Sequence, residues 1–90
     1  MPSSVDQWKV FFYSRRDTQS KQDVFDGIWE QYYKRLFFFI RQMVGEDAED
    51  LLQEIMLKVY QNMEKYNPIY SFNTWVYTVA RNHTAFHIRR

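Results

Sequence analysis

Gly45 opens the most informative segment of the chain, which reads GEDAEDLLQEIMLKVYQNMEK over residues 45–65. Its apolar residues recur at steps of three and four, which is the period of one face of an α-helix. They are Ala48, Leu51, Leu52, Ile55, Val59 and Met63. Acids crowd the first turn, where the helix dipole favours negative charge. The pair Asn67-Pro68 ends the helix, because a residue before proline avoids the helical region. The segment predicts an amphipathic helix over residues 47–65.

The segments on either side carry the same helical periodicity. Residues 23–44 predict a long helix, and Gly45 directly after it is a favourable stop. Ser71 is a suitable N-cap for a third helix. The rows expected to be buried are Phe25, Ile28, Trp29, Tyr32, Leu36, Phe39, Ile40 and Met43 in the first helix and Phe72, Trp75, Val76, Val79, Ala80 and His83 in the third. The sequence therefore predicts an all-α fold, a three-helix bundle formed by residues 23–90.

Residues 1–22 differ from the rest and form a predicted N-terminal aromatic arm. Polar and charged residues surround one apolar cluster, which consists of Trp8, Val10, Phe11, Phe12 and Tyr13. Two interpretations remain open for this arm. It is partly ordered and caps the domain with its aromatic residues, or it is a tether that binds a partner.

Composition limits the class of protein. Ninety residues, 46% of them hydrophobic, form one domain that needs a dense core. The absence of cysteine excludes a disulfide scaffold and fits a reducing compartment. The net charge of +1 is unevenly distributed: residues 46–54 hold five acids and no base, whereas residues 71–90 hold three arginines and no acid. A chain with one acidic patch and one basic end is expected to face two different partners.

The sequence indicates neither a signal peptide nor a membrane span. The longest apolar run in the first predicted helix covers residues 36–40, whereas a spanning helix needs roughly 20 residues. Residues 1–7 lack a basic region followed by an apolar one. We therefore expect a cytoplasmic protein without a membrane partner.

Motifs for catalysis or metal binding are sparse. With only two glycines there is no phosphate-binding loop, and no set of residues suits nucleophilic catalysis. His83 and His87 have the spacing of a shared zinc site, but such a site needs three or four ligands. We predict no catalytic residue, no cofactor and no metal, with His83 partly buried and His87 exposed. A helical enzyme or metal protein built on these histidines is the remote alternative.

Asp50, Gln53 and Glu54 share one face of the central predicted helix because of their i, i+3, i+4 spacing. Lys58 continues that face four residues after Glu54. From spacing alone, a solvated face with a Glu–Lys pair is the favoured explanation of the pattern.

Three blocks of sequence together resemble the second conserved region of bacterial RNA polymerase sigma factors of the extracytoplasmic-function (ECF) group. The first block is GEDAEDLLQEIMLKVY (residues 45–60), and the second is FNTWVYTVARN (residues 72–82), followed by Arg89-Arg90. The third consists of Phe25, Trp29, Tyr32-Tyr33 and Leu36. The resemblance covers residues 23–90 and implies a sigma region 2 helical domain that acts in transcription initiation and is not an enzyme.

This resemblance also implies partners. In the family, the helix that here carries Asp50, Gln53 and Glu54 docks on the coiled coil of the beta-prime subunit of core RNA polymerase. The link over residues 66–71 helps to form a pocket for a base flipped from the promoter −10 element, and the next helix contacts the non-template strand. An anti-sigma factor is a further expected partner. The implied DNA contacts are Tyr66, Asn67, Tyr70, Ser71, Asn73, Thr74, Thr78, Arg81, Asn82 and Arg89.

Among these residues, the resemblance implies that Asn82 is the polar base reader. The aromatic residues near the link, Tyr66, Tyr70, Phe72 and Trp75, are candidates for stacking on unpaired bases. Of these, we expect Phe72 and Trp75 to be partly buried and Tyr70 to be exposed.

Two departures from the family pattern bear on DNA binding. Phe86 stands where the family usually has an acid four residues after Asn82, which leaves Arg89 freer to meet phosphate. Thr78 and Val79 stand where housekeeping sigma factors carry paired aromatics, so we expect modest melting power. The family's second helical domain, which reads the −35 element, is not within these residues. The alternative function is a helical protein-interaction module that binds polymerase or an anti-sigma factor without reading DNA.

Overall fold

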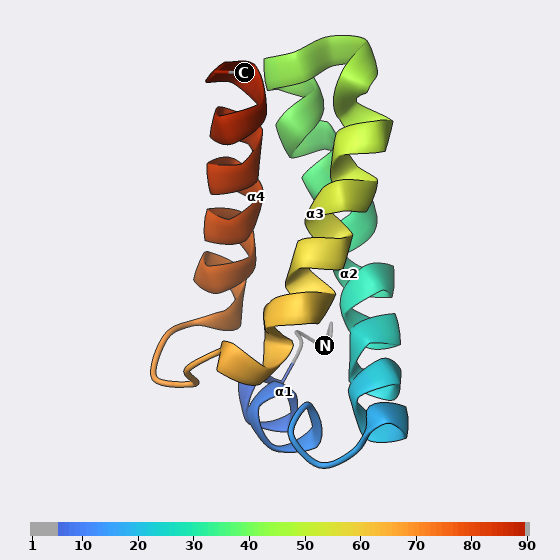
Figure 1. The fold of residues 1–90 in the computed structure, drawn as a ribbon, viewed down its shortest axis with the longest axis vertical. Helices are drawn as coiled ribbons and strands as arrows, with labels where there is room; N and C mark the ends of the chain where they lie inside the picture. The colour runs from blue at the N-terminus through green and yellow to red at the C-terminus, as the bar shows by residue number, and fades with distance from the viewer. Residues whose placement is uncertain (1–5, 90) are drawn as a thin grey trace.

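The computed structural model describes residues 6–89, which form a bundle of helices without a β-strand. The helices are α1 (Gln7–Tyr13), α2 (Thr18–Val44), α3 (Ala48–Asn62) and α4 (Phe72–Arg89). Single 3-10 turns, Gly45–Asp47 and Met63–Lys65, follow α2 and α3. The three long helices run side by side, up, down and up, and short α1 lies at the end of the bundle near the link between α3 and α4 (Figure 1). The predicted all-α three-helix bundle is confirmed, and α1 adds a short helix to it.

The core lies between the three long helices and contains an almost unbroken set of apolar side chains. All six residues predicted to be buried in α3 and its following turn are buried. The row predicted for α2 is too wide, because Trp29 and Met43 are each 41% exposed. The buried apolar residues are Val10, Ile28, Tyr32, Leu36, Ile40, Ala48, Leu51, Leu52, Ile55, Met56, Val59, Met63, Tyr66, Phe72, Val76 and Ala80.

The ends of the long helices follow from individual residues. Helix α2 begins before the predicted start at Asp23, because the Asp17 carboxylate accepts a hydrogen bond from the Ser20 backbone N–H at 2.7 Å. The same bond lowers the pKa of Asp17. Gly45 ends α2 with a φ of 62°, a conformation that favours glycine. The Ser71 hydroxyl accepts from the Thr74 backbone N–H at 3.4 Å, so both predicted helix boundaries are confirmed.

Helix α1 is packed against the bundle from residue 7 onward. Val10 and Ser14 are buried, and α1 contacts both α2 and the Met63–Lys65 turn. Of the two interpretations of the arm, capping therefore fits residues 6–22, but Val10 and Ser14 provide it, while Trp8 and Phe12 are exposed. Residues 1–5 of the predicted arm lie outside the described residues. The proposed boundary between residues 22 and 23 falls inside α2.

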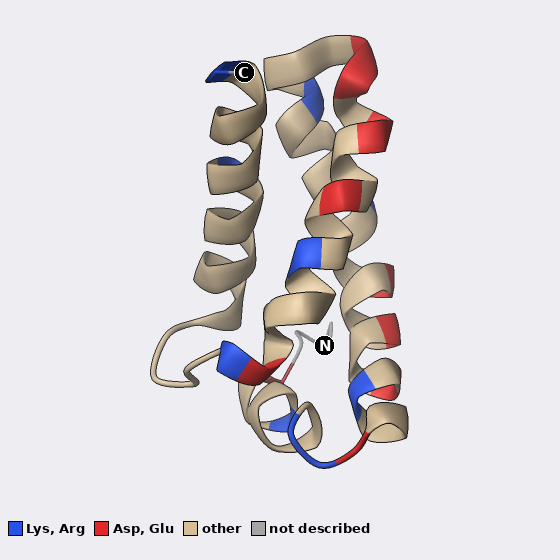
Figure 2. Ribbon diagram, in the orientation of Figure 1, with Lys and Arg blue, Asp and Glu red and all other residues tan. Residues whose placement is uncertain are grey.

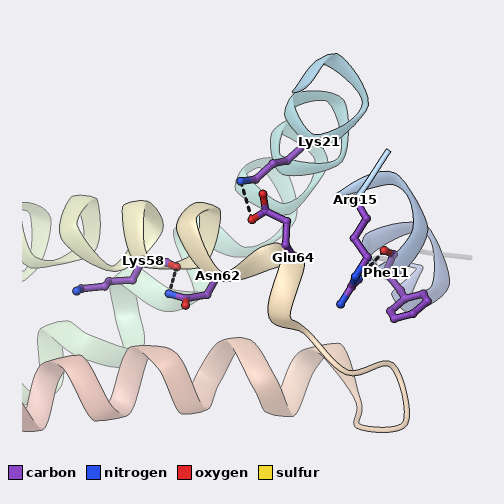
Figure 3. Close-up of polar contacts among 6 residues, drawn as sticks. All are labelled: Phe11, Arg15, Lys21, Lys58, Asn62 and Glu64. Atoms are coloured by element: carbon purple, nitrogen blue, oxygen red, sulfur yellow. Dashed lines mark hydrogen bonds and ion pairs between the residues drawn. The ribbon is translucent and has the colours of Figure 1, made fainter. Parts of the chain in front are cut away.

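An ion pair joins the start of α2 to the turn after α3. The Lys21 ammonium lies 2.9 Å from a Glu64 carboxylate oxygen (Figure 3) and 4.1 Å from the centroid of the Tyr60 ring. The hydrogen bond from Lys21 lowers the pKa of Glu64. Because the folded-state pKa is the lower one, this pair contributes stability above the ordinary pKa range of glutamate and loses it as the pH falls through the folded-state pKa.

We therefore expect Glu64→Gln to destabilise the fold at neutral pH but not in acid. A partly exposed ion pair contributes about 0.2–1 kcal/mol, which corresponds to a fall in melting temperature of roughly 1–8 °C for a domain of this size. Thermal melts followed by circular dichroism at neutral and acidic pH measure the difference in melting temperature between variant and wild type. Glu30→Gln, at an exposed glutamate of α2, is the control. If the difference in melting temperature were the same in acid, the stabilising role of the Lys21–Glu64 ion pair would be wrong.

Candidate functional site

The face predicted on α3 is exposed and strongly acidic. Asp50, Gln53 and Glu54 all point away from the buried row of α3 and are exposed. Acidic residues follow the first half of this helix, whereas α4 carries only basic ones (Figure 2). The structure thus brings the three predicted side chains together on one charged surface.

Two histidines of α4 contact acidic residues of this surface and of the turn before α3. His83 Nε2 lies 2.9 Å from a Glu54 carboxylate oxygen, and His87 Nε2 lies 3.6 Å from an Asp47 carboxylate oxygen. His83 is partly buried, as predicted. The prediction that His87 is exposed is wrong, because this residue is also partly buried. Sequence analysis predicted neither pair, because both depend on how α4 lies against α3 and the Gly45–Asp47 turn.

A polar face of α4 lies opposite to its core. The buried residues of α4 recur at steps of four: Phe72, Val76, Ala80 and Thr84. Helical geometry places another set on the opposite side, at about 100° per residue. It consists of Thr74, Thr78, Arg81, Asn82 and Arg89, of which all but the partly buried Thr78 are exposed. The Thr78 hydroxyl donates to the Thr74 carbonyl at 2.8 Å, so its proton is used within the helix.

Asn73 lies apart from this polar face and turns toward α2. Its side-chain oxygen accepts hydrogen bonds from the Tyr32 hydroxyl at 3.0 Å and from the Arg35 guanidinium at 3.3 Å. Arg35 also lies over the Tyr32 ring, 4.7 Å from its centroid. Asn73 therefore anchors the first turn of α4 to α2, a role that its place in the sequence did not reveal.

The link between α3 and α4 is held by its own side chains. The Asn67 side-chain oxygen accepts from the Ile69 backbone N–H at 3.1 Å, and the Ser71 hydroxyl caps α4. The Tyr66 hydroxyl donates to the Tyr70 carbonyl oxygen. These three residues shape the link, and they leave Ile69 and Tyr70 strongly exposed at its tip. Tyr70 was expected there, whereas sequence analysis missed Ile69.

The expectation that Tyr66 contacts DNA and stacks on a base is wrong. Its ring is fully buried, and burial raises the pKa of its hydroxyl. The ring contacts Phe72 and Trp75 with centroids 5.4 and 5.3 Å away. Phe72 is buried rather than partly buried, and Trp75 is partly buried as predicted. The Tyr66 ring thus belongs to the core and offers no face to a base, because Phe72 and Trp75 already occupy its surroundings.

Within residues 6–89, no three histidine or acidic side chains come close enough to hold a metal ion. In the same part of the chain, no helix has both the length and the hydropathy for a membrane crossing.

Comparison with known proteins adds an independent finding. The Sigma-70 region 2 family model matches residues 28–90. The chain is 32% identical over 71 residues to the ECF RNA polymerase sigma factor SigW of Bacillus subtilis (strain 168), covering 77% of this chain and 38% of SigW. It is 36% identical over 63 residues to the RNA polymerase sigma factor CarQ of Myxococcus xanthus, covering 68% of this chain and 36% of CarQ. The chain thus spans little more than a third of the length of these relatives. No solved structure matches it significantly.

Proposed function

Because this chain belongs to the Sigma-70 region 2 family, we propose that it binds core RNA polymerase through α3 and captures the non-template strand of the promoter −10 element with the link and α4. Domains of this family act in transcription initiation and are not enzymes. The observation that carries the proposal is the separation of charge between the acidic face of α3 and the acid-free polar face of α4.

The polymerase contact consists of Asp50, Gln53 and Glu54. These side chains are available to a partner without any loss of core packing, because the buried residues of α3 lie on another side of the helix. A rigid acidic surface suits a basic partner such as the beta-prime coiled coil, since complementary charge raises the association rate and fixes the register. An anti-sigma factor that covers the same surface would compete with polymerase.

Base capture uses a link whose shape is already set before DNA arrives. The Asn67 and Ser71 side-chain oxygens accept backbone hydrogen bonds and the Tyr66 hydroxyl donates one, which fixes the link, so little conformational entropy is lost on binding. Tyr70 offers an exposed ring for stacking. On α4, Asn82 has both a donor and an acceptor for a base edge, and Arg81 and Arg89 supply charge for phosphate.

The test is binding of the chain to single-stranded and duplex oligonucleotides of the same sequence. We expect a single strand selected from a random pool to bind clearly more tightly than the duplex of the same sequence. With a net charge of +1, the attraction of the protein to DNA phosphates is too weak to hold the duplex. Fluorescence anisotropy at two salt concentrations measures both affinities. Core polymerase binding without any preference among single strands would favour the alternative, a protein-interaction module that does not read DNA.

A further inference from the structure

An exposed group of aromatic rings covers the outer side of α1 and has no role in the proposed function so far. It consists of Trp8, Phe11 and Phe12, here called the α1 aromatic cluster. Trp8 and Phe12 are nearly parallel, with an interplanar angle of 29° and centroids 6.3 Å apart. Phe11 meets both rings edge-on, at 6.3 and 5.0 Å. More than half of the Trp8 and Phe12 surfaces is exposed, although burial of such rings is strongly favourable in water.

The cluster is fixed beside the link that the proposed function uses for base capture. The Gln7 side-chain amide donates to the Pro68 carbonyl at 2.6 Å, and the Arg15 guanidinium donates to the Tyr66 carbonyl at 3.2 Å. Arg15 also donates to the Phe11 carbonyl at 2.6 Å and lies over the Phe11 ring, 4.1 Å from its centroid. Figure 3 shows Phe11 and Arg15 pointing from α1 to the side on which the link passes. Side chains of α1 thus hold the helix that carries the cluster against the backbone of the link at Tyr66 and Pro68.

The segment around the cluster has a small excess of positive charge, which suits a polyanion such as DNA. Residues 6–17 carry three bases and two acids. Both acids make local contacts: Asp6 accepts from the Trp8 backbone N–H at 2.9 Å, and Asp17 caps α2 and lies 3.8 Å from the Arg16 guanidinium. The three bases, Lys9, Arg15 and Arg16, are exposed.

From these observations we infer that the α1 aromatic cluster is a second stacking site for single-stranded DNA, which receives an unpaired base neighbouring the one held by the link. Exposed aromatic rings interleaved with basic side chains are the usual means of holding unpaired bases without sequence preference. The inference rests on the proposed function, since the link provides the first contact with the strand. It extends the DNA surface to residues that precede the part of the chain matched by the family, residues 28–90.

A protein partner is the competing occupant, because exposed Trp and Arg are also common in protein interfaces. Three features favour the single strand. Basic side chains outnumber acidic ones by three to two over residues 6–17, the Trp8 and Phe12 rings are inclined to each other by 29°, and two hydrogen bonds fix α1 against Tyr66 and Pro68 of the link.

The test compares a short single strand, selected from a random pool for tight binding to the whole chain, with the same strand extended by a few thymidines at the 5′ or the 3′ end. We expect one of the two extensions to bind more tightly to wild type than the short strand. The double variant Trp8→Ala, Phe12→Ala should bind the short strand like wild type but lose the gain from extension. The expected loss is roughly 5- to 150-fold, the effect of removing stacking on one base.

Phe38→Ala is the matched control, because Phe38 of α2 is 58% exposed and Phe12 is 59% exposed. Circular dichroism and thermal melts verify that each variant keeps its helices. If wild type gains nothing from either extension, or if the double variant keeps the gain, the inference is wrong while base capture by the link stands. If wild type binds no single strand, base capture and the inference fall together. A double variant that binds DNA like wild type but loses binding to core polymerase would assign the cluster to a protein partner instead.

Discussion

Replacement of both Asp50 and Glu54 by lysine is expected to abolish binding to core RNA polymerase. Both carboxylates are exposed on one face of α3, and the reversal would set two positive charges against the basic surface that the proposed contact requires. Like charges placed together at an interface cost several kcal/mol, so the affinity should fall about a hundredfold or more. Surface plasmon resonance with immobilised core enzyme measures this loss.

The pair between His83 and Glu54 calls for a second variant in this experiment. Because Glu54 Oε1 lies 2.9 Å from His83 Nε2, Glu54→Lys also removes a contact between α3 and α4 and is expected to lower the melting temperature. Asp50→Lys alone leaves that contact in place and should still weaken binding strongly. Glu30→Lys makes the same charge change at an exposed position of α2 and should bind like wild type. Wild-type affinity in the double variant would refute the assignment of this surface.

The second large effect concerns Asn82 on the polar face of α4. Asn82→Ala is expected to weaken the preferred single strand by about 1–3 kcal/mol and to relax the choice of base at one position, as for the loss of a base-edge contact. The side chain is exposed and lies opposite to the buried row, so truncation should leave the melting temperature nearly unchanged. Anisotropy with single strands that differ at one position at a time reports both changes.

Arg89→Ala provides the contrast that makes the Asn82 result interpretable. Loss of a phosphate contact should weaken all single strands alike and reduce the salt dependence by about one unit of slope. If Asn82→Ala produced that same uniform loss across every oligonucleotide, Asn82 would not read a base.

The sequence predicted the long helices because their signals are local. The apolar row of α3, the glycine at position 45 and the N-cap at Ser71 each act within a few residues, and all three predictions are confirmed. The early start of α2 was missed although its signal is also local. The Asp17 side chain caps the helix through Ser20, but the polar residues that follow resemble a loop in composition.

The parts of the candidate site that the sequence did not predict depend on contacts between distant segments. Tyr66 and Tyr70 are both aromatic residues of the link, and only the packing of Phe72 and Trp75 decides that the first is buried. The turn of Asn73 toward Tyr32 and Arg35 likewise requires α2 and α4 to be placed side by side. The contact between His83 and Glu54 requires the antiparallel register of α3 and α4.

The attachment of α1 to the link has a practical consequence for anyone who trims this domain to its recognisable part. The segment matched by the family begins at residue 28, inside α2, and would leave out α1, the Asp17 cap and Lys21. Such a fragment would lose Val10 from the core and the two hydrogen bonds that hold the backbone of Tyr66 and Pro68. The link that we propose for base capture would then have to be ordered by each incoming strand at the expense of affinity. The shortest version that keeps these contacts between α1 and the link therefore begins no later than Asp6, well upstream of the boundary suggested by sequence similarity.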